Sequence, residues 1–174
     1  MKLWFRASNV DWDAQRYRYP TEQTLLTLFP GERPEYPNTP VPTDLNGVTN
    51  AVLFTLRRGK AFATMTALLL RDGRRTRGQV RFPAEKLDAL PEQVYHTVQR
   101  ALKQAFYKAG SAFLGRDLPW GSLTGVRPVK LPTKALLAGA TPAQAERELA
   151  KTYRVAPLRR KLAMDCAAQS VKGG

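Results

Sequence analysis

The stretch from Leu118 to Lys130 divides the chain into two parts with different predicted structures. Its thirteen residues include two glycines, two prolines, one tryptophan and two cationic side chains. This composition is too irregular for a helix or a central strand. The residues before it have the patterns of strands and one long helix, whereas those after it have the patterns of short helices only. We therefore predict an α+β domain over residues 1–117, a connector over 118–130 and a helical segment over 131–174.

Four runs in the first part predict strands. Lys2 to Ser8 begins with apolar side chains that alternate crudely with polar ones. Val48 to Arg57 and Ala61 to Leu70 are apolar runs separated by three residues, as in a hairpin. The Asp72-Gly73 pair is a strong signal for a two-residue turn into a last strand, Arg75 to Phe82. We expect an antiparallel sheet of about four strands.

The last of these strands has one cationic face. Its outward positions alternate with apolar or small ones and are Arg75, Arg77, Gln79 and Arg81. Such charges protect an edge strand from pairing with another chain. A strand face that contacts a polyanion would have the same pattern, and the sequence leaves both interpretations open.

Pro91 to Leu114 is the clearest helix of the chain. Its apolar residues recur at spacings of three and four, and the opposite face is polar. Thr21 to Phe29, behind Pro20, predicts a shorter helix. We expect both helices to cover the sheet. After the connector, short helices are predicted over Lys130–Ala138, Ala143–Thr152 and Val155–Gln169.

The chain lacks the common catalytic and metal-binding motifs. It has no Cys-x-x-Cys, His-x-x-x-His, Walker loop or Gly-x-Ser-x-Gly. The carboxylate pairs Asp11/Asp13 and Glu146/Glu148 lie on polar stretches, so we predict no catalytic or metal residue. The single cysteine, Cys166, cannot form an internal disulfide. No signal peptide or membrane span is evident, which favours a cytoplasmic protein without membrane contact.

The net charge of +14 favours an anionic partner without identifying it. A basic, solvated surface is one explanation of this charge, and nucleic acid, an acidic ligand or an acidic protein surface are others. The run Arg16-Tyr17-Arg18-Tyr19 would suit base stacking, but it is more typical of a rim in which the aromatic rings cover the core.

Four connector residues are candidates for ligand binding. Trp120 would anchor the loop by burial or cover a ligand. Thr124 offers a hydroxyl group, and Arg127 offers a forked donor suited to a carboxylate or phosphate. Lys130 adds a second cation. A connector that only fixes the helical part is an equally good explanation of the same residues.

The connector also resembles a known signature. Pro119 to Lys130 is similar to the Pro-Trp-Gly-x-Leu-Thr-Gly-x-Arg-Pro-x-Lys pattern in the N-terminal region of HemZ-type oxygen-independent coproporphyrinogen III oxidases (coproporphyrinogen dehydrogenases), which are radical SAM enzymes. The resemblance covers about residues 110–170. Before residue 110 only the order of the elements agrees.

This resemblance implies a non-catalytic fragment of an oxidoreductase of haem and porphyrin biosynthesis. In the family a Cys-x-x-x-Cys-x-x-Cys motif holds a [4Fe–4S] cluster that binds S-adenosylmethionine, and two propionates of coproporphyrinogen III are oxidatively decarboxylated. We expect that motif just after Gly174, because one cysteine cannot build the cluster. The present chain would then be an accessory domain that docks on the radical SAM catalytic domain or aids substrate binding.

The expected ligand on this interpretation is an acidic tetrapyrrole. Arg127 and Lys130 would be the first partners of its carboxylates, and the arginines between Arg71 and Arg81 the second. Related radical SAM proteins include haem chaperones, so the resemblance indicates the class of chemistry better than the substrate. The alternative is a nucleic-acid (tRNA) binding module, with Arg16–Tyr19 and the cationic strand as its binding face.

Overall fold

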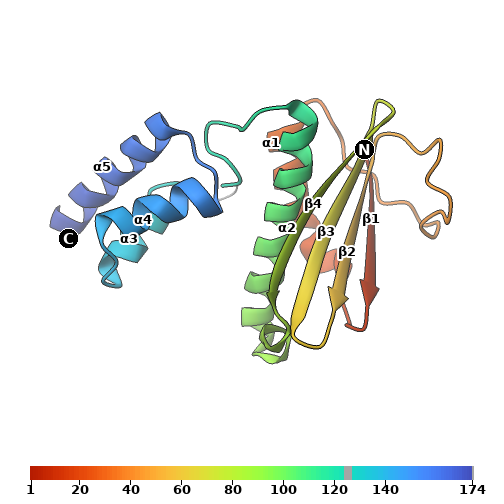
Figure 1. Cartoon of the computed structure of the whole chain (residues 1–174), viewed down its shortest axis with the longest axis horizontal. Coiled ribbons are helices and arrows are strands. Elements are labelled where there is room, and N and C mark those ends of the chain that lie inside the picture. The colour runs from red at the N-terminus through yellow and green to blue at the C-terminus, as the bar shows by residue number, and fades with distance from the viewer. Residues whose placement is uncertain (124–126, 174) are drawn as a thin grey trace. The chain divides into compact units, whose positions relative to one another are not determined.

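The computed structural model describes residues 1–123 and 127–173, which belong to two compact units, Met1–Gly115 and Arg116–Gly174 (Figure 1). The first unit (unit 1) contains the sheet and the longest helix, and the second (unit 2) contains helices. The predicted α+β class is thereby confirmed, with a long helix on the sheet and helices at the C-terminal end.

The sheet of unit 1 has four strands in the order β1-β2-β3-β4. Their bounds are Lys2–Ser8 (β1), Ala51–Arg58 (β2), Phe62–Arg71 (β3) and Arg74–Pro83 (β4). The antiparallel pairing that we predicted holds for β2, β3 and β4. It is wrong for β1, which pairs parallel with β2. The reason is that helix α1 (Arg18–Leu28) and the proline-rich segment after it (residues 30–42) return the chain to the end of the sheet where β1 begins.

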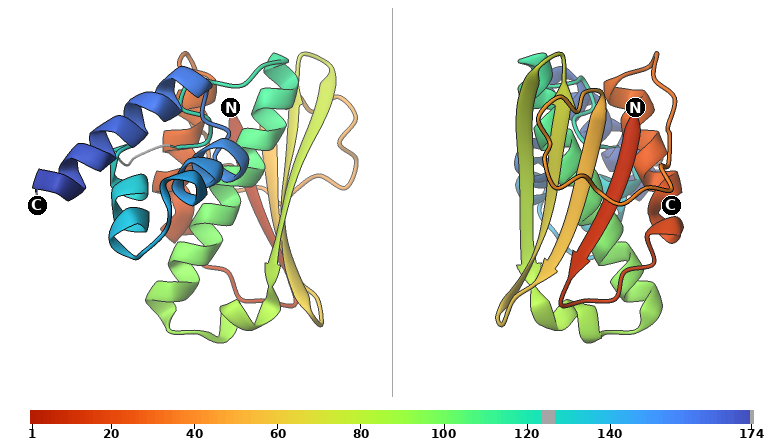
Figure 2. Two further views of the ribbon diagram at one scale, coloured as in Figure 1. Left: turned by 60° about the vertical axis from the view of Figure 1, so that its left-hand side comes forward. Right: turned by 90° about the vertical axis from the view of Figure 1, so that its right-hand side faces the viewer.

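Two helices, α1 (Arg18–Leu28) and α2 (Pro91–Leu114), cover one face of this sheet, as Figure 2 shows. A short 3-10 helix precedes each of them, η1 (Ala14–Tyr17) and η2 (Ala84–Asp88). The apolar face of α2 packs on β3 and β4. Phe106 of α2 also meets Phe54 of β2 edge to face, with their centroids 5.2 Å apart. At Gly78 a Cβ atom would lie 1.9 Å from the carbonyl oxygen of Ala105, so only glycine permits this close approach.

The other face of the sheet carries no helix among the described residues of unit 1. Only one end of it is covered, where Val41 and Val48 pack on Trp4, Ala51 and Leu53. The remainder of that face is open to solvent.

Unit 2 contains α3 (Lys130–Leu137), α4 (Pro142–Arg147), the π-helical turn η3 (Glu148–Thr152) and α5 (Pro157–Gly173). Thr141 caps α4 through a capping box with Gln144, and a proline occupies the first turn, as the sequence predicts. The core of the unit is a small cluster made of Leu123, Leu149, Val155 and Ala163.

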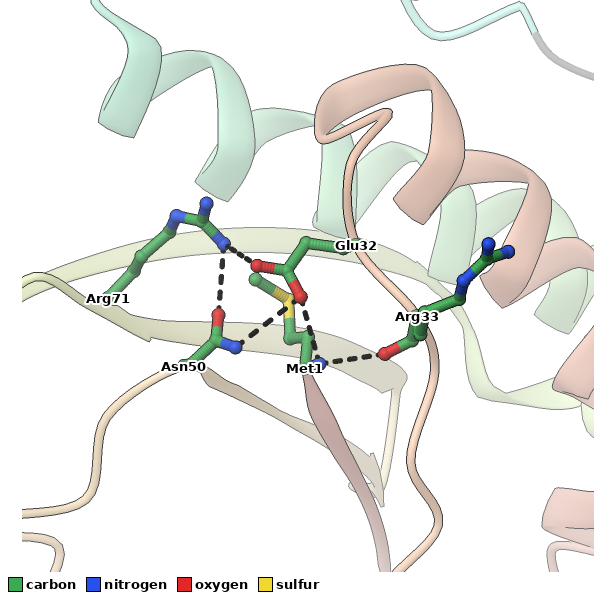
Figure 3. A network of polar contacts seen from close by, with 5 residues as sticks. All are labelled: Met1, Glu32, Arg33, Asn50 and Arg71. Carbon is green, nitrogen blue, oxygen red and sulfur yellow. Dashed lines mark hydrogen bonds and ion pairs between the residues drawn. The ribbon is translucent and has the colours of Figure 1, made fainter.

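A polar network ties the beginning of the chain to three other segments of unit 1 (Figure 3). The carboxylate of Glu32 accepts hydrogen bonds from Arg71 (2.5 Å), the Met1 amine (3.0 Å) and Asn50 (3.4 Å). The Met1 amine also donates to the carbonyl oxygen of Arg33 at 2.8 Å. Partial burial raises the pKa of Glu32, but the hydrogen bonds outweigh this effect and lower the pKa to about 2.

We predict that this network makes unit 1 sensitive to acid. The pKa of Glu32 falls below its ordinary value of 4.5 on folding, so its stabilisation is complete above about pH 5 and is lost as the pH falls towards 2. Glu32→Gln should lower the free energy of unfolding at pH 7 by about 1.5–3 kcal/mol and flatten its dependence on pH in this range. Urea unfolding between pH 3 and pH 7 measures both effects. Glu35→Gln, at an exposed neighbouring carboxylate, is the control and should retain the acid sensitivity.

Candidate functional site

The first half of the connector is fixed by backbone contacts within unit 2. The Ser122 N–H donates to the carbonyl oxygen of Tyr153 at 2.8 Å, and the Ala156 N–H donates to that of Pro119 at 2.9 Å. Gly121 has a φ of 58°, and a Cβ atom there would lie 1.8 Å from the carbonyl oxygen of Tyr153. Glycine is therefore required at this position for both its conformation and its size. These contacts agree with a structural role for residues 119–122.

Trp120 lines neither of the hollows described below. Trp120 is half-buried and packs against the core cluster of unit 2, with the guanidinium of Arg159 5.6 Å from its ring centroid. Its described contacts are those of an anchor for the connector. Thr124 lies outside the described residues.

Arg127 and Lys130 lie together at an open hollow of about 540 Å³ in unit 2. The described residues that line it come from the segment just before α3, from the length of α3 and from the end of α5, and comprise Arg127, Val129, Lys130, Thr133, Lys134, Leu137 and Ser170. They include three cations and no carboxylate. The Thr133 hydroxyl donates to the carbonyl oxygen of Val129 at 2.7 Å. We call this site the α3 hollow.

Sequence reasoning missed Lys134 as part of the α3 hollow. The signal was its spacing, because residues four apart in a helix lie on the same face, which puts Lys134 one turn beyond Lys130. Leu137 follows on that face and is 70% exposed. The α3 hollow thus combines cationic groups with exposed apolar surface.

A second hollow, of about 400 Å³, lies on the uncovered side of the sheet in unit 1. Three arginines line it, Arg6 from β1, Arg57 from β2 and Arg77 from β4. Strand pairing sets Arg6, Thr55, Thr66 and Gln79 in one row across the sheet, and Leu53 and Leu68 in the next. The remaining lining residue is Thr64. We call this surface the open sheet face.

The arginines between Arg71 and Arg81 separate into two groups. Arg71 is bound to Glu32, and Arg74 donates to the carbonyl oxygen of Phe113 while covering its ring. These two stabilise the fold. Arg77 lies in the open sheet face. Arg75 and Arg81, on the same side of β4, have only a 3.4 Å contact with Asn46 and a ring contact with Phe62, respectively.

The Arg16–Tyr19 run forms a rim over the core. Tyr17 is buried and stacks on Tyr95 with a centroid distance of 5.1 Å. The guanidinium of Arg16 lies over the Tyr95 ring, and that of Arg18 lies over Tyr36. Of the two tyrosine rings in this run, only that of Tyr19 is well exposed. The arrangement offers no row of free rings for bases to stack on.

The described residues do not fit the [4Fe–4S] cluster that the resemblance implies for the whole enzyme. No group of three His, Cys, Asp or Glu side chains in residues 1–123 and 127–173 is placed to hold a metal ion. Cys166 supplies a single thiol, and a cluster of this kind needs three.

No helix in the described part of the chain is long and apolar enough to cross a membrane. Comparisons of the chain with protein-family models, curated proteins and solved structures found no match. The two hollows and their side chains are therefore the features of the molecule that bear on its function.

We predict that Gly121→Ala disrupts unit 2. A methyl group at this position would lie too close to the Tyr153 carbonyl oxygen, and the positive φ adds strain. The free energy of unfolding should therefore fall by more than the roughly 1 kcal/mol typical of a point mutation. Gly139→Ala, also at positive φ but with free space around its Cβ, is the matched control and should cost less. Hydrogen exchange of the α5 amides in the two variants measures the difference. Equal exchange rates would contradict the prediction.

Proposed function

We propose that this chain is a non-catalytic accessory part of a radical SAM enzyme of the oxygen-independent coproporphyrinogen III oxidase type, and that its α3 hollow holds carboxylates of the tetrapyrrole. The observation that carries the proposal is the grouping of Arg127, Lys130 and Lys134 beside exposed apolar side chains. The resemblance of residues 119–130 to the family signature is the second support.

The α3 hollow matches the chemistry of such a ligand. A tetrapyrrole with propionate groups has a broad apolar ring and several carboxylates at its edge. Arg127 would bind one carboxylate with two parallel hydrogen bonds, and Lys130 and Lys134 would act as point charges on others. Val129 and Leu137 would contact the ring. A volume of about 540 Å³ is within the range of small-molecule sites.

Binding and orientation are the contribution expected of this chain. The oxidative decarboxylation would belong to the catalytic domain of the same protein, whose cluster and S-adenosylmethionine supply the radical chemistry. The cations of the α3 hollow would hold the propionates and attract the ligand over a distance, an effect that salt screens. We further propose a cytoplasmic location, because a chain with one cysteine needs no oxidising compartment.

A docking role on the catalytic domain has one observation in its favour. Leu158 and Leu162 lie one turn apart on α5, with exposed fractions of 83% and 49%. Exposed apolar side chains at this spacing are typical of a helix that packs on a partner. Docking and ligand binding use different residues of unit 2, so variants can separate them.

Titration with coproporphyrin III, followed by its absorbance and fluorescence, tests the ligand. We expect binding to the full chain that weakens with salt, and a loss of about 5- to 20-fold for Arg127→Ala or Lys130→Ala, as for the removal of one charged hydrogen-bond partner. Lys151→Ala, at an exposed lysine of unit 2 outside the α3 hollow, should bind normally. The tetramethyl ester, which lacks the carboxylates, should not bind. Equal affinity of all variants would exclude the α3 hollow as the site.

A further inference from the structure

We propose that the open sheet face of unit 1 binds the phosphate backbone of single-stranded nucleic acid, at a site separate from the α3 hollow of unit 2. The inference goes beyond the proposed function and depends on different residues.

The side of the sheet that carries the open sheet face has cationic side chains but no acidic ones. Alternation along the strands assigns to this side of the sheet no aspartate or glutamate, but six cations: Lys2, Arg6, Arg57, Arg75, Arg77 and Arg81. Among the described residues, none of the three arginines in the hollow has an ion pair, and the one side-chain hydrogen bond they make is a 3.4 Å contact from Arg6 to Thr55. The three arginines face Thr55, Thr64 and Leu68 across the strands and not one another, so their mutual repulsion acts over longer distances, and an anionic ligand would lessen it.

Edge protection does not explain this charge. The charges on β1 and β4 are at sheet edges, where they would discourage pairing with other chains. Arg57 belongs to β2, an inner strand with neighbours on both sides. Its exposed guanidinium therefore needs another explanation, and a ligand that crosses the strands supplies one.

The side chains between the arginines suit phosphate oxygens. Thr55, Thr64 and Thr66 present hydroxyl groups, and Gln79 presents an amide. Hydroxyl, amide and guanidinium groups are those that commonly bind the backbone of nucleic acids. In contrast, Leu53 and Leu68 are the only apolar residues among the described residues that line the hollow, which is few for a compact apolar ligand.

The spread of the cations favours an extended ligand. A four-stranded sheet is about 14 Å wide between its outer strands, and Arg6 and Arg77 lie on opposite outer strands with Arg57 between them. A flexible strand with repeated negative charges can contact all three. A hollow of about 400 Å³ admits part of such a strand, whereas a rigid duplex would touch only its rim.

The open sheet face would not distinguish one base from another. Trp4, the one tryptophan of this face, is 7% exposed and packs beneath the segment that contains Val41 and Val48. Stacking on it is blocked, and Phe62, an exposed ring on this side, is already covered by the guanidinium of Arg81 at 4.5 Å. Phosphate contacts would therefore dominate, and binding would depend little on sequence. Such contacts weaken with salt by about 0.7 log units per phosphate for each tenfold rise in concentration. Three arginine contacts predict a slope of about −2.

Fluorescence anisotropy of the full chain with a labelled single strand of about twelve uridines, a length within the usual site sizes, tests the proposal. We expect binding with the predicted salt slope. Arg57→Gln combined with Arg77→Gln should weaken it at least tenfold, whereas Arg57→Lys with Arg77→Lys should retain most of it. The charge-matched control, Arg33→Gln with Lys86→Gln, alters exposed cations elsewhere in unit 1 and should change affinity by less than twofold.

Three results would overturn the proposal. Equal losses in the two glutamine double variants would mean that the general charge of the chain attracts the strand. Tighter binding of a duplex of the same length would exclude a site for single strands. Inorganic phosphate or a mononucleotide that displaces the strand at equal phosphate concentration would indicate a small-anion site. Arg127→Ala should leave binding of the strand unchanged, which separates this result from the test of the α3 hollow.

Discussion

The packing of α2 against β3 and β4 is the contact on which the rest of unit 1 depends. It is closest at Gly78, where the helix backbone occupies the place that a Cβ atom would need. Phe54 and Phe106 are fully buried beside it, and burial of each such side chain contributes about 1.5–3 kcal/mol. Because α1 and α2 cover this side of the sheet, each strand needs apolar side chains on the side that faces these helices. The alternation of side chains then places the polar and charged groups on the other side, together with the apolar cluster of Trp4, Ala51 and Leu53 that Val41 and Val48 cover.

That division explains how a set of arginines from three strands can share one face of the sheet. Within β4, Gly78 and Phe82 face the core, whereas Arg77 lies in the open sheet face. Paired strands also fix the backbone positions from which Arg6, Arg57 and Arg77 extend. Fixed positions lower the ordering cost of binding, since only side-chain freedom is lost. The α3 hollow depends instead on two helices of unit 2, which have no such network of hydrogen bonds between them.

The sequence predicts which helices and strands form far better than it predicts which elements lie next to one another. The spacing of apolar residues in Pro91–Leu114 gave the exact bounds of α2, and Asp72-Gly73 correctly predicted the turn before β4. The parallel pairing of β1 was not predictable, because it depends on where a long proline-rich segment returns the chain. Arg6 and Arg57 were missed for the same reason, since they lie 51 residues apart and meet only through strand register. Arg127 and Lys130 could be predicted as a pair because they are close together in the connector. Lys134 lies beyond the connector and joins them only through the one-turn spacing of α3.

The distribution of charge argues for two anion sites rather than one. Met1–Gly115 carries 17 Lys and Arg against 10 Asp and Glu, and Arg116–Gly174 carries 11 against 4, so each unit has an excess of seven positive charges. A single basic patch beside the connector would explain the excess of positive charge in unit 2 but not that in unit 1. In unit 1 several cations are already bound to carboxylates or rings, as Arg71 and Arg58 are. Exposed cations also occur elsewhere in unit 1, at Arg33, Lys60 and Lys86, but the open sheet face lies on a side of the sheet to which the strands assign six cations and no acidic residue. Charge that served only solubility would not require a face free of acidic residues, so this arrangement favours a ligand.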